Sequence, residues 1–349
     1  MERTGRGCPY NELILIKKTR LHAMANPSIV NSSTKPAPSS RQGSLVRLMR
    51  NIVRYRVLLL MLLPTTVVFF VNCYIPMFGV FIAFKNINYV DGILGSPWAG
   101  LDNFRFLFAT SDAMRVTVNT VGYNVVFIIT GLILSVAIAI AVNEVRAKLA
   151  SKFYQTVMIM PNFLSMVVVS YIVYAFLHPE YGFLVKYVLP LFGHSSVNAY
   201  MHPQAWPYIL WLTKMWHSVG IGSIIYLAAI TGISEELYEA AVMDGASKWQ
   251  QVTRITLPLL TPVMVILTIL NLGGIFRSDF GLFYHVTLDS GALRSTTDVI
   301  DTYVYRGLIQ LNDLGMSSAA NFYQSIVGFF LVIGANSLAR KLNRDTALF

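Results

Sequence analysis

The segment between Ser234 and Pro262 carries the residues whose chemistry can be read most directly from the sequence. It places a carboxylate at Glu239, two alanines directly after it and an aromatic side chain at Trp249. Small residues permit the close approach of a second protein, a carboxylate offers a partner for a cation, and a large aromatic anchor contributes strongly to interface energetics. This combination predicts a docking surface for another protein.

Local signals predict that the segment begins with a short helix. Ser234 is a good N-cap residue, and Glu235 and Glu236 follow it in the first turn, where the helix dipole favours carboxylates. Gly245 suits the left-handed conformation of a helix C-terminal cap. We therefore expect a helix that stops at a glycine turn.

A second short helix is predicted directly after that turn. Ser247 stands three residues before Gln250, which is the spacing of a capping box. We expect this helix to end at Leu257–Pro258, since proline disfavours helix continuation. Two short helices would then meet at the glycine.

A lysine within an apolar stretch marks a second candidate site. Lys214 lies about two turns into the stretch Pro207–Ile230, close to Trp211, Trp216 and His217. An ionisable side chain at that depth costs roughly 3 kcal/mol on insertion scales and usually faces a cavity or a partner. Aromatic faces with a few polar groups suit a saccharide, so these four residues are candidates for a substrate pathway. Alternatively, Lys214 reaches the interface or pairs with another subunit's carboxylate, and the tryptophans are lipid anchors.

Six further polar side chains flank the apolar stretches and complete the candidate pathway: Asn119, Tyr123, Asn124, Arg277, Asp279 and Tyr284. Two roles are open to them, because polar groups between membrane helices either line a pathway or pack helices together through hydrogen bonds. A cargo with carboxylates would find partners in Lys214 and Arg277. A neutral oligosaccharide is the alternative.

The sequence shows no pattern for catalysis, nucleotide binding or metal binding. It has no GxxxxGK[ST] phosphate loop, and no nucleophile elbow or triad-like cluster stands out. The six histidines lack HExxH or paired spacing, and the two cysteines share no motif. We expect no enzyme activity, metal or cofactor on this chain, so another polypeptide must supply energy.

The elements that must position these residues are membrane spans. Of the 349 residues, 55% are hydrophobic and 13% are charged, which lies outside the range of ordinary soluble domains. A spanning helix needs roughly 20 mostly apolar residues, and six such stretches are present. They are Val57–Phe78, Val118–Val142, Phe153–Leu177, Pro207–Ile230, Leu257–Phe276 and Asn321–Ala339. The predicted fold class is an all-α membrane protein with six transmembrane helices.

The distribution of Lys and Arg predicts the orientation of the chain. Six spans put both termini on one side of the membrane, and 19 of the 27 basic residues fall in segments on that side, which is therefore cytoplasmic. We expect residues 1–50 to form a disordered basic cytoplasmic arm, in which Met24 offers an alternative start, and residues 51–345 to form the transmembrane domain. A nucleic-acid partner is not expected, because there is no folded basic domain.

Irregular features are predicted inside and between the spans. Three prolines predict kinks or interruptions: Pro64, Pro161 and Pro262. Two outer loops, His178–Trp206 and Arg277–Ala320, are long enough to make contacts of their own. Helical spacing over Thr297–Gln310 predicts a short surface helix within the second loop.

The docking segment resembles a known family. The residues that carry the resemblance are Glu239, Ala240, Ala241, Asp244, Gly245, Ala246, Trp249, Ile255, Leu257 and Pro258. Their pattern resembles the EAA loop of permease subunits in binding-protein-dependent ABC importers. The six-span layout over about residues 50–340 resembles the type I (MetI-like) architecture of these permeases. Residues 97–108 and 297–308 look like the carbohydrate branch of the family.

The resemblance implies partners and a mechanism. The loop at residues 231–262 would dock as a bent helix pair in a cleft of a cytoplasmic ATPase subunit, and the residues of the pattern would couple the two proteins. Two ATPases, which bind ATP and Mg, would drive this chain and a second homologous permease through alternating access in a bacterial cytoplasmic membrane. An extracytoplasmic solute-binding protein would deliver an oligosaccharide or polysaccharide fragment. The alternatives are a stand-alone secondary transporter or channel, and a membrane enzyme such as a glycosyl transferase that uses Asp298 and Asp301.

Overall fold

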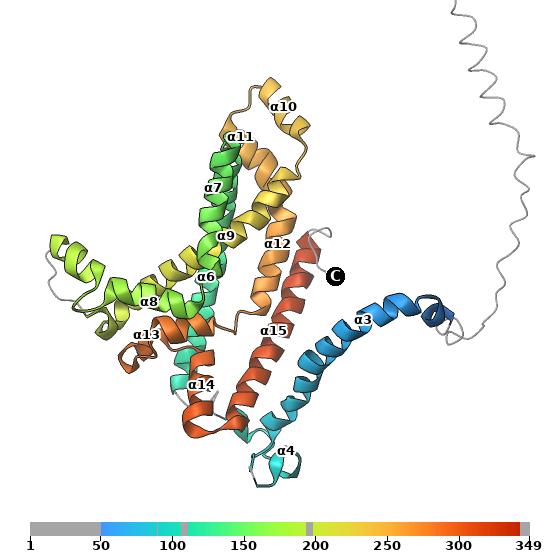
Figure 1. Ribbon diagram of the computed structural model, residues 1–349, viewed down its shortest axis with the longest axis vertical. Coiled ribbons are helices and arrows are strands. Elements are labelled where there is room, and N and C mark those ends of the chain that lie inside the picture. Colours follow the sequence, from blue (N-terminus) through green and yellow to red (C-terminus); the bar gives the residue numbers. More distant parts are fainter. Residues whose placement is uncertain (1–49, 89, 106–110, 193–197, 343–349) are drawn as a thin grey trace, which may run out of the picture. The chain divides into compact units, whose positions relative to one another are not determined.

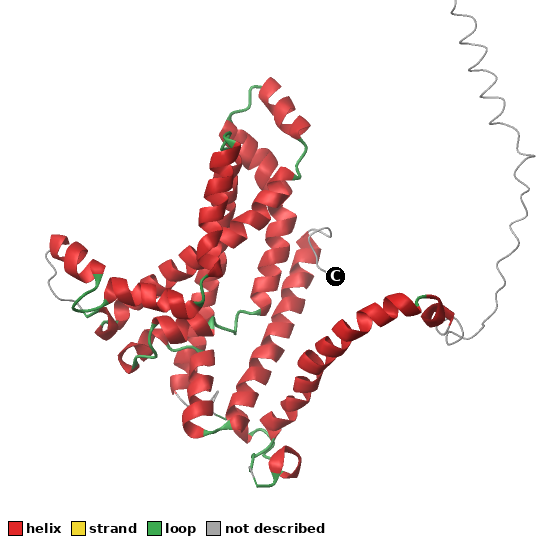
Figure 2. Cartoon of the chain, viewed as in Figure 1, coloured by secondary structure: helices red, strands yellow, loops and turns green. Residues whose placement is uncertain are grey.

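The computed structural model describes residues 50–88, 90–105, 111–192 and 198–342. Figure 2 shows that the regular structure in these residues is helical, apart from one isolated bridge between Lys85 and Trp98. The predicted all-α class is confirmed for the described part of the chain. The predicted arm at residues 1–50 lies outside it, except for Arg50.

The α-helices follow one another along the chain (Figure 1). They are α3 (Arg56–Phe69), α4 (Gly92–Gly95), α6 (Ser111–Asn143), α7 (Lys148–Ile159), α8 (Met166–Leu177), α9 (Trp206–Thr231), α10 (Glu235–Met243), α11 (Lys248–Gln251), α12 (Leu257–Gly273), α13 (Arg294–Thr297), α14 (Ile300–Leu311) and α15 (Leu314–Leu342). Three π-helical or 3₁₀ segments matter below: Met160–Phe163, Val252–Thr256 and Gly281–Val286.

The chain divides into two compact units, which are considered separately. The first ends at Asn72 and contains α3, whose apolar side chains are all solvent-exposed within the chain. The second runs from Cys73 and contains every other helix named above. An apolar helix without a buried residue is suited to a lipid or protein environment.

Four helical stretches are long and apolar enough to cross a membrane: Arg56–Phe84, Asp112–Asn143, Lys248–Gly273 and Leu314–Lys341. Two bent helix pairs pass the same test together: Lys148–Phe163 with Met166–Leu177, and Pro203–Thr231 with Glu235–Met243. By length and composition, the described residues therefore hold four candidate spans, or up to six if each bent pair counts as one, which agrees with the six predicted stretches.

The third predicted span, Phe153–Leu177, is not one continuous helix. The chain bends by 98° between Lys148–Phe163 and α8, so the interruption predicted at Pro161 is confirmed. After the break, Ser165 caps α8 by accepting the Val168 N–H at 3.4 Å. The other two prolines lie inside continuous helices, Pro64 in α3 and Pro262 in α12.

The core of the second unit lies along α6 and α9, which pack against each other over much of their lengths. One buried cluster joins these helices to the segment after α12, with Trp206, Leu210 and Leu282 at its centre. At Gly220, a Cβ atom would overlap the Met158 carbonyl, so α9 crosses the end of α7 at backbone contact. A second cluster joins α6, α9 and α12 nearer to α10.

Candidate docking elbow and polar cavity

The segment Glu235–Gln251 forms a bent helix pair, here called the elbow, which consists of α10, the turn after it and α11. Gly245 follows α10 with φ of +76°, in the left-handed region that favours glycine. The Ala246 N–H donates to the Ala241 carbonyl at 2.9 Å, which is the long closing bond of a Schellman cap. The predicted glycine turn is confirmed.

Both predicted N-cap positions are also found. The Ser247 hydroxyl accepts the Gln250 N–H at 3.3 Å, and the Gln250 side-chain oxygen accepts the Ser247 N–H at 2.7 Å, which completes the predicted capping box. Ser234 precedes α10 as predicted, although its hydroxyl makes no capping hydrogen bond. The bend therefore follows from local sequence signals on both sides of the glycine.

The prediction that the second helix ends at Leu257–Pro258 is wrong. The helix continues through a π-helical turn at Val252–Thr256 into α12, which makes one stretch of 26 residues from Lys248 to Gly273. The Leu257 N–H donates to the Val252 carbonyl across this wider turn. Because a π-turn changes the register of the bonds just before Pro258, the missing proline N–H is accommodated without a break.

Two contacts attach the elbow to the spans. The Lys248 ammonium pairs with the Glu144 carboxylate, directly after α6, at 3.1 Å. The Tyr238 hydroxyl of α10 lies 2.9 Å from the buried Thr256 hydroxyl, at the start of α12. The elbow is therefore fixed to α6 on one side and to α12 on the other.

The remaining surface of the elbow is apolar and acidic. The exposed fractions are 47% for Leu237, 86% for Met243 and 73% for Trp249. Glu239 and Asp244 are exposed beside them. Apolar side chains gathered on a surface mark a contact site for a partner.

The structure brings most of the predicted docking residues together around two hollows. A cavity of about 320 Å³ is lined by Ala241, Asp244, Gly245, Ala246 and Ile255, together with Gln250, Gln251 and Arg254. Trp249 and Leu257 line a groove beside α6. Glu239, Ala240 and Pro258 are exposed outside both linings. The sequence interpretation missed Arg254, although its spacing of four residues from Gln250 puts both on one helix face.

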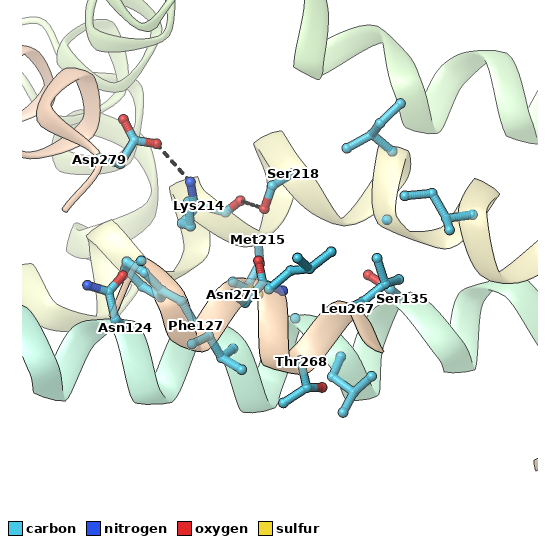
Figure 3. A pocket seen from close by; sticks show the side chains of 18 of the residues that line it. Asn124, Phe127, Ser135, Lys214, Met215, Ser218, Leu267, Thr268, Asn271 and Asp279 are labelled. Atoms are coloured by element: carbon cyan, nitrogen blue, oxygen red, sulfur yellow. Dashed lines mark hydrogen bonds and ion pairs between the residues drawn. The ribbon is translucent and has the colours of Figure 1, made fainter. Parts of the chain in front are cut away.

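A larger cavity, of about 550 Å³, lies between α6, α9 and α12 (Figure 3). Four predicted pathway residues line it: Asn124, Lys214, Arg277 and Asp279. The Lys214 ammonium and the Asp279 carboxylate form an ion pair at 2.7 Å. Lys214 therefore has its charge partner within the chain, whereas the alternative interpretation had placed that partner on another subunit.

The other aromatic candidates lie elsewhere. The Trp211 N–H donates to the Thr130 hydroxyl at 3.0 Å. Trp211 lines a separate cavity of about 740 Å³, together with Asn119 and Tyr123. Trp216 is 45% exposed, and a ring nitrogen of His217 lies 3.2 Å from the Leu164 carbonyl. Neither residue lines the cavity of Figure 3.

Several polar candidates act as packing groups. The Asn119 amide donates to the Asp298 carbonyl and the Tyr123 hydroxyl to the Thr296 carbonyl, each at 2.9 Å. The Asn124 amide donates to the carbonyls of Ile275 and Arg277. Tyr284 stacks on Phe280 outside the cavity. These bonds support the helix-packing alternative for Asn119 and Tyr123, whereas Asn124 both packs and lines the cavity.

Sequence reasoning missed several polar residues of the cavity wall, among them Ser135, Ser218, Thr268, Asn271 and Ser278. The hydroxyls of Ser218 and Thr268 donate to carbonyls one turn back, at Lys214 and Met264, which lets them lie in apolar helices at little cost. Two spacings could have revealed three of them. Ser218 lies four residues after Lys214, and Thr268 lies three before Asn271, so each pair shares a helix face.

Next to the end of α6 remote from the elbow lies a partly buried charge group, here called the Arg306 cluster, which comprises Asp289, Arg294, Asp298 and Arg306. Arg306 pairs with Asp289 at 2.8 Å and with Asp298, and its side chain is 10% exposed. The predicted helix over Thr297–Gln310 exists as α14, in which the ion-paired Arg306 is buried and Ile309 is 61% exposed.

The carboxylates proposed for a membrane enzyme are engaged within the chain. Asp298 is buried against Arg306 and accepts the Thr302 hydroxyl at 2.9 Å. Asp301 accepts the N–H and the hydroxyl of Ser278. Among the described residues there is also no group of three or more His, Cys, Asp or Glu arranged to hold a metal ion. Both carboxylates of the enzyme alternative are therefore held by bonds within the chain.

Comparisons with known proteins agree with this architecture. Residues 127–344 match the family described as binding-protein-dependent transport system inner membrane component. The chain is 33% identical over 299 residues to the polygalacturonan/rhamnogalacturonan transport system permease protein YteP of Bacillus subtilis, covering 86% of this chain and 92% of that protein. It is 31% identical to protein LplB of the same organism, covering 89% and 97%.

A solved structure shares the fold. One chain of a bacterial ABC transporter involved in the import of the acidic polysaccharide alginate superposes with a TM-score of 0.77 at 34% identity, covering 85% of this chain and 99% of that chain. A second structure shows that kind of transporter in complex with an alginate pentasaccharide-bound periplasmic protein, with a TM-score of 0.76 at 33% identity and coverage of 85% and 98%.

The fold and the comparisons together define a multi-pass membrane protein of the transport permease class. The chain belongs to the family of binding-protein-dependent transport system inner membrane components. The predicted membership of this chain in the ABC importer permeases, and its resemblance to their carbohydrate branch, are confirmed at the level of the family.

Proposed function

We propose that this chain is the membrane permease subunit of an ATP-driven importer of oligosaccharides or polysaccharide fragments. It carries no catalytic centre of its own. Separate ATPase subunits, which bind ATP and Mg, would engage the elbow and drive alternating access of the cavity between α6, α9 and α12. The alternative is a secondary transporter or channel that works alone.

The observation that carries this proposal is the continuity between elbow and cavity. One helical stretch, Lys248–Gly273, begins in the elbow next to Trp249 and passes Thr268 and Asn271 in the cavity wall. At 1.5 Å per residue it spans roughly 40 Å. The Lys248–Glu144 pair couples the same elbow to α6, which forms another wall. A push on the elbow would therefore move two walls of the cavity directly.

The topology and partners complete the proposal. The Lys and Arg distribution supports an orientation in which the elbow and both termini would lie in the cytoplasm of a bacterium, with residues 51–345 as the permease domain in its cytoplasmic membrane. Two ATPases, a second homologous permease and an extracytoplasmic solute-binding protein would form the complex. A relative imports an acidic polysaccharide with a periplasmic protein, which supports a saccharide cargo here.

Transport by the reconstituted complex tests the proposal. The chain is purified with its ATPases and second permease, placed in proteoliposomes and supplied with the binding protein and a panel of neutral and acidic oligosaccharides. We expect uphill uptake of at least one saccharide that requires ATP on the elbow side. Uphill uptake by this chain alone, without an ATPase, would favour the secondary transporter, and passive equilibration would favour a channel.

A further inference from the structure

The cavity of Figure 3 has an uneven charge distribution. Lys214, Arg277 and Asp279 are its only charged lining residues among those described, and they lie on α9 and on the segment that follows α12. The rest of the lining is apolar or neutral and polar. Charges at membrane depth are costly, so a group of three that faces a cavity points to a ligand with charge of its own.

The segment that carries two of these charges is held firmly. Asp301 of α14 accepts the Ser278 N–H at 2.6 Å and its hydroxyl at 2.5 Å. The Gln324 amide of α15 donates to the Phe276 carbonyl at 2.7 Å, and Asn124 of α6 donates to the carbonyls on either side. Three helices therefore fix the backbone of residues 275–278, and the charged side chains start from a defined position.

The two cations are reachable from the cavity. The side chains of Lys214 and Asp279 are 25% and 27% exposed, so their ion pair is not sealed in the core. Arg277 is exposed, and its guanidinium donates to the Ser325 hydroxyl at 3.0 Å and to no other acceptor among the described residues. A guanidinium has five N–H donors in a planar fork that matches a carboxylate.

We propose that Lys214 and Arg277 form a carboxylate-binding subsite for an acidic saccharide, and that Asp279 is a resident counter-ion which the carboxylate of the cargo replaces at Lys214. The inference rests on the proposed function, because it assumes that the cavity is the transport pathway. The displaced Asp279 keeps the hydrogen bond that its other carboxylate oxygen accepts from the Leu282 N–H at 3.2 Å.

An exchange of one carboxylate for another suits transport better than simple binding. Lys214 carries a paired charge both before and after the exchange, so neither state leaves its ammonium without an anionic partner. A pathway must bind strongly enough for entry and weakly enough for release. The competition from Asp279 limits the net affinity at Lys214, whereas Arg277 supplies the preference for an anion.

Matched cargoes test the exchange. Proteoliposomes that contain the full complex are given uronic-acid oligosaccharides or the same oligosaccharides with each carboxyl reduced to an alcohol, and the ratio of acidic to neutral uptake is compared between variants. The binding protein is common to all variants, so its own preference cancels. We expect Lys214→Gln to lower this ratio about tenfold, the scale of one lost charge-assisted hydrogen bond. Asp279→Asn removes the competitor and should raise the ratio about threefold.

The control and the contrary outcomes are specific. Asp112→Asn removes an ion pair with Arg115 at 3.0 Å that does not line the cavity, and it should leave the ratio unchanged. Equal losses of acidic and neutral uptake in Asp279→Asn would overturn the proposal, because the pair would then be purely structural. If the reduced sugars are not carried at all, the half-saturating concentration of the acidic sugar decides. A lower value in Asp279→Asn supports the exchange, and an unchanged or higher value overturns it.

The proposed function fails differently. A wild-type complex that carries no saccharide with ATP would refute the importer itself. A complex that carries neutral and acidic saccharides with the same ratio in every variant would refute only the subsite.

Discussion

The elbow and the Arg306 cluster lie at opposite ends of α6 and differ in whether their carboxylates are paired within the chain. Near one end of α6 the Asn119 amide contacts Asp298 of the cluster, and directly after the other end Glu144 contacts Lys248 of the elbow. The acidic residues of α10 and its turn are all exposed, and none joins an ion pair among the described residues: Glu235, Glu236, Glu239 and Asp244. In the cluster, Asp289 and Asp298 are both paired.

The difference separates charge that holds the fold from charge that is left for a partner. A buried carboxylate without a partner costs several kcal/mol, so the cluster must be satisfied within the chain for α14 to pack. Exposed carboxylates beside exposed apolar side chains cost little in water and are available for an interface. On this basis, variants at the cluster should change stability, and variants at the elbow should change coupling.

The largest effect expected at the elbow comes from Gly245→Asp. A Cβ at Gly245 meets no atom of this chain within 4 Å, so the variant should fold and insert. The added side chain fills the space around the glycine turn where the ATPase would approach, and we expect ATP-linked uptake to be abolished. Uptake in proteoliposomes and the amount of inserted protein are measured together.

Gly92→Asp is the matched control for backbone strain. Gly92 also has a positive φ, of +69°, and also has open space around its Cβ position, but it lies outside the elbow. An aspartate in the left-handed region costs about 1–2 kcal/mol at either site. Normal uptake by Gly245→Asp, or an equal loss in Gly92→Asp, would show that the glycine turn has no special part in coupling.

Arg306→Met should give the largest loss of stability. The substitution leaves Asp298 buried with the Thr302 hydroxyl as its side-chain partner, whereas Asp289 keeps Arg294 at 3.7 Å. Breaking a buried pair in this way costs about 3–5 kcal/mol. We expect a marked fall in the thermal unfolding temperature of the detergent-solubilised complex.

Two further variants test the cause of that loss. Adding Asp298→Asn to Arg306→Met removes the lone buried charge and should recover much of the stability. Arg294→Met removes a 41% exposed side chain and should cost about 1 kcal/mol or less. If all three variants unfold at the wild-type temperature, the cluster does not hold the fold as the comparison states.

The same contrast explains what the sequence could predict. The capping box of Ser247 and Gln250 and the turn at Gly245 depend on residues a few positions apart, so local rules found both. The spans followed from length and apolarity alone. The pattern of the elbow was readable because its candidate docking residues lie close together in the sequence and several of them, including Glu239, Asp244 and Trp249, remain exposed.

Long-range packing accounts for what the sequence could not show. Lys214 was expected to need a partner, but Asp279 lies 65 residues away and only the fold brings the two together. The helical spacing around Arg306 is found on exposed helix faces as well as on buried ones, so it did not predict burial. The partners of Arg306, Asp289 and Asp298, lie outside its own helix. The break at Pro161 was predicted, whereas neither the 98° angle nor the close approach of Gly220 to Met158, which is distant in the sequence, follows from a local pattern.

A smaller and selective effect is expected from Trp249→Ala. The ring is 73% exposed, so its removal should leave the unfolding temperature of this chain within about 1–2 °C of wild type. If Trp249 is an interface anchor, loss of its ring should weaken association with the ATPase by about tenfold or more. Copurification and titration of the ATPase measure this association. Tyr181→Ala removes a similarly exposed ring, at 74%, away from the elbow and should leave association unchanged. Equal binding by both variants would remove Trp249 from the interface.

The smallest stability effect should come from Lys248→Gln, and it sharpens the division between holding and coupling. The Lys248 and Glu144 side chains are 67% and 46% exposed, so the ion pair contributes at most about 0.2–1 kcal/mol. Yet this pair joins the elbow to α6, so its loss should reduce the uptake obtained per ATP hydrolysed while ATPase binding persists. The ratio of the uptake rate to the ATP hydrolysis rate measures this directly. Reversal of the pair, Lys248→Glu with Glu144→Lys, should restore the ratio. If Lys248→Gln leaves the ratio intact, force passes from the elbow to the cavity through the helix of α11 and α12 alone.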